Sequence, residues 1–126
     1  DCHIILRGGK EPNFDAKSVA AACETLKANG HREVVMIDAS HSNSHKKCRE
    51  QIGVVNDICS QVSGGTNSII GVMIESNLVE GNQKIDSGKP LVYGQSVTDA
   101  CLGWDDTVTL LNNLAHSVRD RRSRMQ

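Results

Sequence analysis

Apolar runs alternate with helical patterns along this chain, and no other feature limits the possible fold as strongly. Runs typical of buried strands occur in the stretches CHIILRGG, REVVMIDAS and SIIGVMIES. The first two are followed by segments whose apolar residues recur at intervals of three and four, the spacing of a helix face. SIIGVMIES is apolar almost throughout, which is typical of a strand in a parallel sheet that is covered on both faces. The alternation therefore predicts an α/β fold.

The same pattern indicates where the helices lie. DAKSVAAACETLKANG predicts a helix with Val19, Cys23 and Leu26 on one face and with Gly30 at its C-terminal end. A second helix is expected before the glycine pair at positions 64 and 65. Its predicted apolar positions are Cys48, Ile52, Val55, Cys59 and Val62. Each strand and the helix after it form one βα unit.

A further unit is expected beyond Glu75. Residues 77–94 form a polar, glycine-bearing stretch whose length suggests a functional loop. A weaker strand, QSVTDAC, is expected over 95–101, and Asp105 or Asp106 is expected to cap a last helix. The apolar positions expected on that helix are Val108, Leu111, Ala115 and Val118. Four consecutive βα units result, and they fit either a standalone doubly wound sheet or half of a (β/α)8 barrel.

Composition limits the protein class and the partners. The apolar content of 38% in 126 residues suits one globular domain. A net charge of −1 gives no electrostatic basis for binding nucleic acid. No apolar run approaches the roughly 20 residues of a membrane-spanning helix, so we expect neither a nucleic-acid nor a membrane partner. The five cysteines lack CxxC pairs, and we expect reduced thiols and a cytoplasmic location.

Polar side chains follow each predicted strand at its C-terminal end. They are Arg7, then Asp38 and His41, then Glu75, then Asp99. An imidazole with two carboxylates is a common ligand set for a divalent metal such as Mn, Fe, Co or Zn. A guanidinium beside that set could bind a phosphate through two parallel hydrogen bonds. The pattern indicates metal-assisted chemistry on a phosphorylated anion.

Each of these residues also has a structural explanation. A single His after a strand is often a hydrogen-bonded cap, and Glu75 or Asp99 alone could be a solvated carboxylate in a loop. Arg7 could pair with a carboxylate, and the two glycines after it fit a tight turn as readily as a phosphate cradle. The case for a site depends on all four strand ends meeting at one edge of the sheet.

Four longer stretches carry a resemblance to a known family. DCHIILRGGKEPNFDAKSV, VVMIDASHSNSHKK, GVMIESNLVEGNQ and SVTDACLGWDDT resemble the C-terminal half of the type I 3-deoxy-D-arabino-heptulosonate 7-phosphate (DAHP) synthases. The resemblance implies a (β/α)8 barrel that condenses phosphoenolpyruvate with erythrose 4-phosphate and water, using a divalent metal, at the start of aromatic amino acid synthesis. It covers nearly the whole chain.

The family motifs assign roles to particular residues here. By this resemblance, the metal ligands are His41 of DASHSNS, Glu75 of GVMIES and Asp99 of SVTDAC. The Arg of LRGGK, which contacts the phosphate of phosphoenolpyruvate in the family, corresponds to Arg7. The resemblance thus makes Arg7 and His41 catalytic residues. Asp38 is expected to support His41 rather than to bind the metal.

The chain also departs from the family pattern. Many members have His at the position of Asn77 and Ala at the position of Ser42. The family's fourth metal ligand, a Cys, belongs to the N-terminal half, together with further substrate motifs, and that half is absent from residues 1–126. Cys101 lies near Asp99 in the sequence, but we expect it to be a packed thiol rather than a substitute ligand.

We therefore expect residues 1–126 to be one C-terminal part of a barrel domain whose N-terminal half is absent. The longer protein would be the enzyme and a homo-oligomer, and the isolated piece would be inactive. Its uncovered strand edges would pair with the missing half or with a second copy. The alternative is a noncatalytic α/β binding or assembly module without a complete active site.

Overall fold

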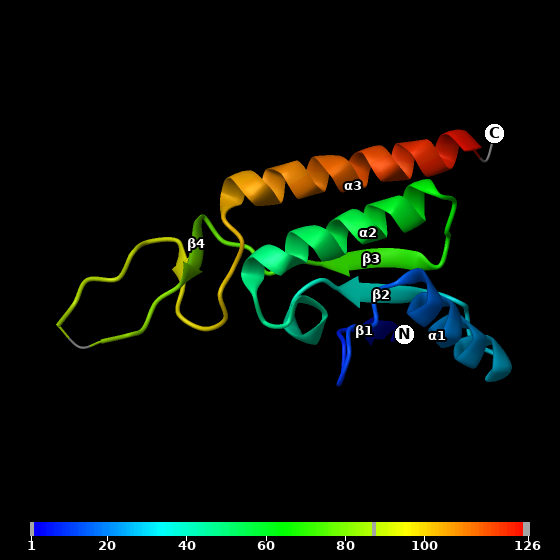
Figure 1. The fold of residues 1–126 in the computed structure, drawn as a ribbon, viewed down its shortest axis with the longest axis horizontal. Helices are drawn as coiled ribbons and strands as arrows, with labels where there is room; N and C mark the ends of the chain where they lie inside the picture. Colours follow the sequence, from blue (N-terminus) through cyan, green and yellow to red (C-terminus); the bar gives the residue numbers. More distant parts are fainter. Residues whose placement is uncertain (1, 87, 125–126) are drawn as a thin grey trace.

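The computed structural model describes residues 2–86 and 88–124 (Figure 1). The chain is α/β, as predicted. Its elements are β1 (Ile4–Leu6), α1 (Ala16–Ala28), β2 (Val35–Asp38), the 3₁₀ turns η1 (His41–Ser44) and η2 (Cys48–Glu50), α2 (Gln51–Ser63), β3 (Ile69–Met73), β4 (Val79–Asn82), β5 (Gln95–Ser96) and α3 (Trp104–Arg124).

The first three strands form one parallel sheet. The strand order is β1-β2-β3, with Ile5 opposite Met36 and Ile37 opposite Val72. Parallel neighbours need a crossover connection, and α1 and α2 provide the two crossovers. The prediction of parallel βα units is confirmed for this part of the chain. All three strands therefore end at the same edge of the sheet.

Helix α1 lies where its sequence signals indicate. The Asp15 side chain accepts a hydrogen bond from Ser18 N at 3.0 Å, which satisfies one of the free amides of the first turn. Gly30 has φ of +71°, a conformation that ends a helix and that glycine adopts without strain. Val19 and Cys23 are buried, and Leu26 packs against them, which confirms the predicted face.

The core lies between the sheet and the helices, and α2 and α3 run side by side (Figure 1). Strand β2 is the central strand, and it contributes Val35 and Ile37 to the core. Its partners from α2 include Val55 and Ile58, and each of these four side chains has no exposed surface. Full burial of such a side chain stabilises the fold by about 1.5–3 kcal/mol. This packing holds β2, and with it the loop that carries His41.

The buried face of α3 differs from the prediction. Of the predicted positions Val108, Leu111, Ala115 and Val118, the last packs against the core and the other three are exposed. The face that turns inward consists of Thr107, Leu110, Leu114, Ser117 and Val118. Burial of the two hydroxyl residues is possible because Thr107 donates to O of Gly103, the residue before the helix, and Ser117 donates to Asn113 O within the helix.

The predicted cap of α3 is also wrong. The helix already begins at Trp104, so Asp105 and Asp106 lie in its first turn instead of at the cap position. Negative charge in a first turn is favourable because the helix dipole is positive there. Asp106 in addition forms an ion pair of 3.1 Å with Arg49, which precedes α2.

The fourth strand does not join the sheet as predicted. Within the predicted range 95–101, only Gln95–Ser96 forms a strand, and it pairs with β4 in a separate two-stranded sheet. A single parallel bridge, Ser76 to Leu102, links the region after β3 to the segment before α3. The chain bends away from a strand after β5, where Ser96 Oγ accepts a hydrogen bond from Thr98 N. Residues 76–86 and 88–100 thus extend beyond the ends of the main strands (Figure 1).

Part of the main sheet is uncovered. Ile4 and Ile5 of β1 are 45% and 49% exposed, and Ile70 of β3 is 55% exposed. The prediction that the third strand is covered on both faces therefore does not hold for the residues that the structure describes. An apolar strand has the same sequence pattern whether this chain or another segment covers it. The pattern therefore predicts a covered face without identifying what packs on that face.

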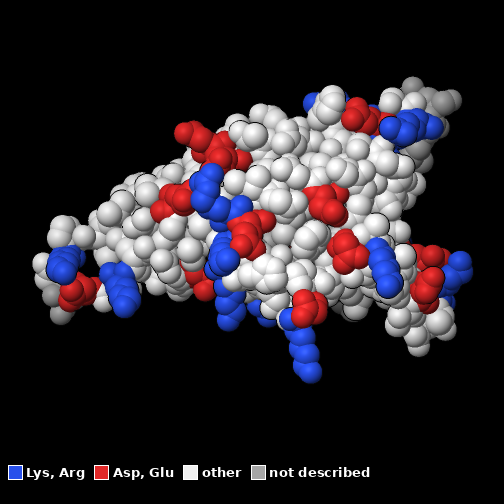
Figure 2. Space-filling model, in the orientation of Figure 1, with Lys and Arg blue, Asp and Glu red and all other residues white. Residues whose placement is uncertain are grey.

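The surface carries charges of both signs. On the face drawn in Figure 2, Lys and Arg side chains lie next to Asp and Glu side chains. Over residues 2–86 and 88–124, no helix combines the length and the apolar character of a membrane span.

Candidate metal centre

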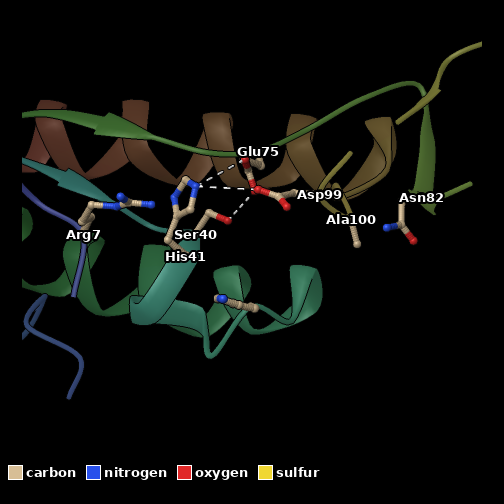
Figure 3. Close-up of a pocket in the computed structure, with 8 residues that line it drawn as sticks. Arg7, Ser40, His41, Glu75, Asn82, Asp99 and Ala100 are labelled. Carbon is tan, nitrogen blue, oxygen red and sulfur yellow. Dashed lines mark hydrogen bonds and ion pairs between the residues drawn. The ribbon is translucent and has the colours of Figure 1, made fainter. Parts of the chain in front are cut away.

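Three of the predicted site residues meet at the C-terminal edge of the sheet. His41 follows β2, Glu75 follows β3, and Asp99 precedes α3. One donor atom from each lies within 4.8 Å of the others. His41 Nε2 is 3.8 Å from Glu75 Oε1 and 3.8 Å from Asp99 Oδ2 (Figure 3). The parallel order of β2 and β3 brings His41 and Glu75 together, and the loop before α3 adds Asp99, which is 58 positions after His41.

Asp38 orients the His41 ring. Its Oδ2 lies 2.7 Å from His41 Nδ1, and its Oδ1 accepts a hydrogen bond from Ser40 N at 2.8 Å. Asp38 is 4% exposed, so water offers its carboxylate few competing hydrogen bonds. With Nδ1 directed at Asp38, the Nε2 atom faces Glu75 and Asp99. This is the arrangement in which a carboxylate supports a metal-binding histidine.

The Glu75 carboxylate is also held at one oxygen. Ser40 Oγ donates to Glu75 Oε2 at 2.6 Å, and Figure 3 shows this contact beside the His41 ring. The other oxygen, Oε1, is the one that approaches His41 Nε2. Each side chain thus uses one atom for support and directs the other at the common centre.

Asp99 is the most exposed of the three, with 67% of its side chain accessible. Its segment is held on two sides. Asn82 donates through Nδ2 to Thr98 O at 2.8 Å, and Leu102 N donates to Glu75 O at 3.0 Å. The second bond joins the segment that carries Asp99 to the backbone of Glu75, a second member of the site.

Arg7 lines the same cavity, which has a volume of about 410 Å³ and also includes Lys46 and Asn82. Figure 3 shows the Arg7 guanidinium on the side of His41 away from Glu75. Two cationic side chains therefore border a cavity that also contains an imidazole and carboxylates. Such a cavity suits an anionic ligand, which the basic side chains can bind, next to a metal cation, which the imidazole and carboxylates can bind.

The backbone amides of the two glycines after Arg7 form hydrogen bonds within their own loop. Gly8 N donates to Asn13 Oδ1 at 2.8 Å, and Gly9 N donates to Glu11 O at 3.0 Å. Because both amides are already bonded, the geometry favours the tight turn over the phosphate cradle. A Cβ atom on Gly8 would lie 2.7 Å from Ser42 Cβ, so glycine is needed here for close contact with the His41 loop.

Asn43 joins the two loops that carry Arg7 and His41. It is 2% exposed, and its Nδ2 donates to Leu6 O at 3.1 Å and to Asp38 O at 2.8 Å. Its Oδ1 accepts from Asn13 N at 2.8 Å. All of these bonds reach backbone atoms, so Asn43 fixes the spacing of the loops.

Cys101 is a half-buried free thiol next to the site. Burial raises the pKa of the Cys101 thiol above its usual value, and the charges of Glu75 and Asp99 raise it further. The Sγ atom lies 3.6 Å from Asp99 O, as a donor. Because metal binding needs the thiolate, these surroundings disfavour Cys101 as a ligand.

The donor set fits a divalent cation. Nitrogen and carboxylate ligands lie about 2.0–2.2 Å from such an ion, so two ligands of one ion are at most about 4.4 Å apart. The two 3.8 Å separations from His41 Nε2 are within that limit. The three donors also come from residue types that Mn, Fe, Co and Zn accept.

Sequence reasoning missed Gln51, Asn43 and Lys46. Gln51 and Asn43 are almost completely buried, although both are polar. A polar residue at the start of a helix is usually exposed, so neither position carries a signal that can be recognised without contacts. Lys46 has φ of +58°, a conformation that is uncommon for lysine and that no sequence pattern predicts here.

The comparisons with known proteins identify a family and several close relatives. Residues 1–112 match the model of the DAHP synthetase I family. The Phe-sensitive phospho-2-dehydro-3-deoxyheptonate aldolase of Escherichia coli K12 is 58% identical over 97% of this chain and 35% of its own length. The Trp-sensitive enzyme of Salmonella typhi is 52% identical over 94% of this chain and 34% of its own.

A solved structure gives the same result for the fold. The phospho-2-dehydro-3-deoxyheptonate aldolase of Francisella tularensis SCHU S4 is 51% identical, with a TM-score of 0.90, over 94% of this chain and 35% of that one. The chain thus spans about a third of the length of the relatives that it matches. On the match over residues 1–112, the chain belongs to the DAHP synthetase I family.

Proposed function

We propose that this chain forms the C-terminal half of a (β/α)8 barrel in a longer DAHP synthase, which joins phosphoenolpyruvate to erythrose 4-phosphate with loss of phosphate. The observation that carries the proposal is the meeting of His41, Glu75, Asp99 and Arg7 in one cavity. The cavity lies at the C-terminal ends of parallel strands, where barrel enzymes keep their active sites. The family match supports the reaction type.

His41, Glu75 and Asp99 would hold a divalent metal ion. When bound, the cation would act as a Lewis acid that polarises the aldehyde oxygen of erythrose 4-phosphate. Asp38 would keep the proton of His41 on Nδ1, so that Nε2 stays available as a donor. Ser40 would fix the carboxylate of Glu75 in the same way.

Arg7 would bind the phosphate group of phosphoenolpyruvate. A guanidinium offers two parallel N–H donors that match two phosphate oxygens. In the condensation, C3 of phosphoenolpyruvate attacks the aldehyde carbon, water adds at C2, and the phosphate leaves. Arg7 would remain with the phosphate and offset the charge that develops on it.

The exposed sheet supports the half-barrel proposal and an inactive isolated chain. Both outer strands of the main sheet, β1 and β3, carry exposed isoleucines, namely Ile4, Ile5 and Ile70. In a closed barrel, neighbouring strands pair with such edges and cover such side chains. Homo-oligomerisation of the longer enzyme and its cytoplasmic location remain predictions.

The test is substitution of each proposed ligand by alanine in the longer enzyme. His41→Ala, Glu75→Ala and Asp99→Ala should each remove most metal-dependent DAHP formation, because each deletes one of few donors. His116→Ala is a matched control, since His116 is an exposed histidine of α3 that pairs with Asp120. Normal activity and unchanged metal affinity in all three ligand variants would exclude this site.

A further inference from the structure

Gln51 makes an unusual set of contacts for the first residue of a helix. It is completely buried at the start of α2. Its Oε1 accepts a hydrogen bond from Glu75 N at 2.8 Å, and its Nε2 donates to Glu75 O at 3.0 Å. The same nitrogen also donates to Cys48 O at 3.2 Å. Both donor hydrogens of the carboxamide therefore have partners.

The Gln51 side chain replaces a neighbouring strand at Glu75. The pairing between β2 and β3 ends with Asp38 opposite Met73, two residues before Glu75. Beyond that point the backbone of Glu75 needs partners other than β2. The carboxamide of Gln51 provides a donor and an acceptor at once, in the manner of a peptide group. Leu102 N adds a second donor to Glu75 O.

The carboxylate of Glu75 is held separately from its backbone. Ser40 Oγ donates to Oε2 at 2.6 Å, and Ser40 is 4% exposed. Gln51 thus holds the backbone of Glu75, and Ser40 holds one oxygen of its carboxylate. The remaining oxygen, Oε1, lies 3.8 Å from His41 Nε2.

We propose that Gln51 is a positioning residue for the metal site, which sets divalent-cation affinity through the backbone of Glu75 without contacting the cation. This inference rests on the proposed role of Glu75 as a metal ligand. Ligands that are held before the ion arrives lose less freedom on binding, so the ion binds more tightly. Gln51 contributes this order from a helix that supplies none of the three proposed ligands.

Removing the carboxamide should weaken binding of the cation. Gln51→Leu deletes all three hydrogen bonds and leaves Glu75 N without its partner. Loss of a group that supports a metal ligand typically lowers metal affinity ten- to a hundredfold, and we expect a change of that size. Gln51→Glu keeps an acceptor for Glu75 N but directs a second oxygen at two carbonyl oxygens. It should therefore also weaken binding.

The experiment is titration of the metal-free longer enzyme with Mn²⁺ in a calorimeter, with wild type, Gln51→Leu and Gln51→Glu. Gln61→Leu is the matched control. Gln61 lies on the same helix, and its Nε2 donates to Phe14 O at 2.8 Å and to Asp57 Oδ1 at 2.6 Å, away from the site. The dissociation constant for Mn²⁺ should rise in the Gln51 variants and stay at the wild-type value in Gln61→Leu.

Thermal unfolding of the metal-free proteins separates positioning from mere structure. A purely structural Gln51 would lower the unfolding midpoint and leave the Mn²⁺ dissociation constant within twofold of wild type, and that result would overturn the inference. If Gln51→Leu does not fold, Gln51→Glu decides the question by the same criterion.

Glu75→Gln in the same titration distinguishes the two levels of the proposal. If Glu75→Gln binds Mn²⁺ as wild type does, the proposed metal site itself is wrong. If Glu75→Gln weakens binding and the Gln51 variants do not, the site stands and the role of Gln51 is wrong.

Discussion

His41 Nδ1 lies 2.7 Å from Asp38 Oδ2, on the opposite edge of the ring from the atom that approaches Glu75 and Asp99. Asp38 is the last residue of β2, and His41 is the first residue of η1. His41 has φ of +49°, and this uncommon backbone conformation turns the chain at that point. The pair therefore combines a rigid strand end with a directed imidazole.

Replacing Asp38 by Asn should weaken metal binding in the longer enzyme. Asn offers an uncharged oxygen, which polarises the His41 ring less and holds its tautomer less firmly. We expect a ten- to hundredfold rise in the dissociation constant for Mn²⁺, measured by calorimetry. Asp57→Asn is the control, because Asp57 accepts from Gln61 within α2. Equal affinities in the two variants would show that Asp38 serves the loop alone.

Replacing Arg7 by Lys should weaken the use of phosphoenolpyruvate. The charge is kept, but an ammonium cannot reproduce the planar pair of donors that matches a phosphate. Loss of one charge-assisted hydrogen bond of about 1.5–3 kcal/mol predicts a fall of roughly ten- to a hundredfold in kcat/KM for phosphoenolpyruvate.

The kinetic constants for erythrose 4-phosphate should change much less in Arg7→Lys. Arg119→Lys, an exposed position on α3, is the control. Wild-type phosphoenolpyruvate kinetics in Arg7→Lys would mean that Arg7 only braces its loop.

The helices and the parallel strands could be predicted because their signals are local. Asp15 and Gly30 mark the ends of α1 through caps that involve neighbouring residues. The grouping of His41 and Glu75 follows from one topological rule, that parallel strands end at the same edge, whereas Asp99 reaches the site from a loop that was predicted to be a strand. The resemblance to the family then supplied their roles.

Contacts between distant residues could not be predicted in this way. Gln51 meets Glu75 across 24 positions, and Asn43 meets Leu6 across 37. The face of α3 was misjudged because the hydroxyls of Thr107 and Ser117 donate to carbonyl oxygens four residues earlier in the chain, so both residues can be buried like apolar ones. The fourth strand was misjudged because β5 pairs with β4 instead of with the main sheet, and no local sequence pattern predicts that pairing.

Gly8→Ala should disturb the site, whereas Gly9→Ala should not. Gly8 has φ of +80°, and an added Cβ would lie 2.8 Å from Asn43 N as well as against Ser42. A residue other than glycine in this conformation costs about 1–3 kcal/mol before any clash is counted. At Gly9 an added Cβ would meet nothing within 4 Å. Urea unfolding and Mn²⁺ titration of the two variants of the longer enzyme test this, and equal effects would contradict it.

The last prediction concerns Asp15, the N-cap of α1. The hydrogen bond from Ser18 Oγ, at 2.7 Å, and that from Ser18 N lower the pKa of the Asp15 carboxyl below its usual value. A lowered pKa means that the ionised cap stabilises the fold above the unfolded pKa of about 3.9 and that this contribution is lost as pH falls through the folded pKa.

Asp15→Ala should therefore lower the unfolding free energy of the longer enzyme by about 1 kcal/mol at pH 6. The difference from wild type should shrink as the pH is reduced below about 4, because the wild-type cap then becomes protonated. Asp15→Asn should show no such pH dependence of its own, since an amide caps a helix without titrating. The measurement is urea unfolding of the three proteins at several pH values. A penalty for Asp15→Ala that stays constant down to pH 3 would show that the charge of Asp15 does not contribute to the cap.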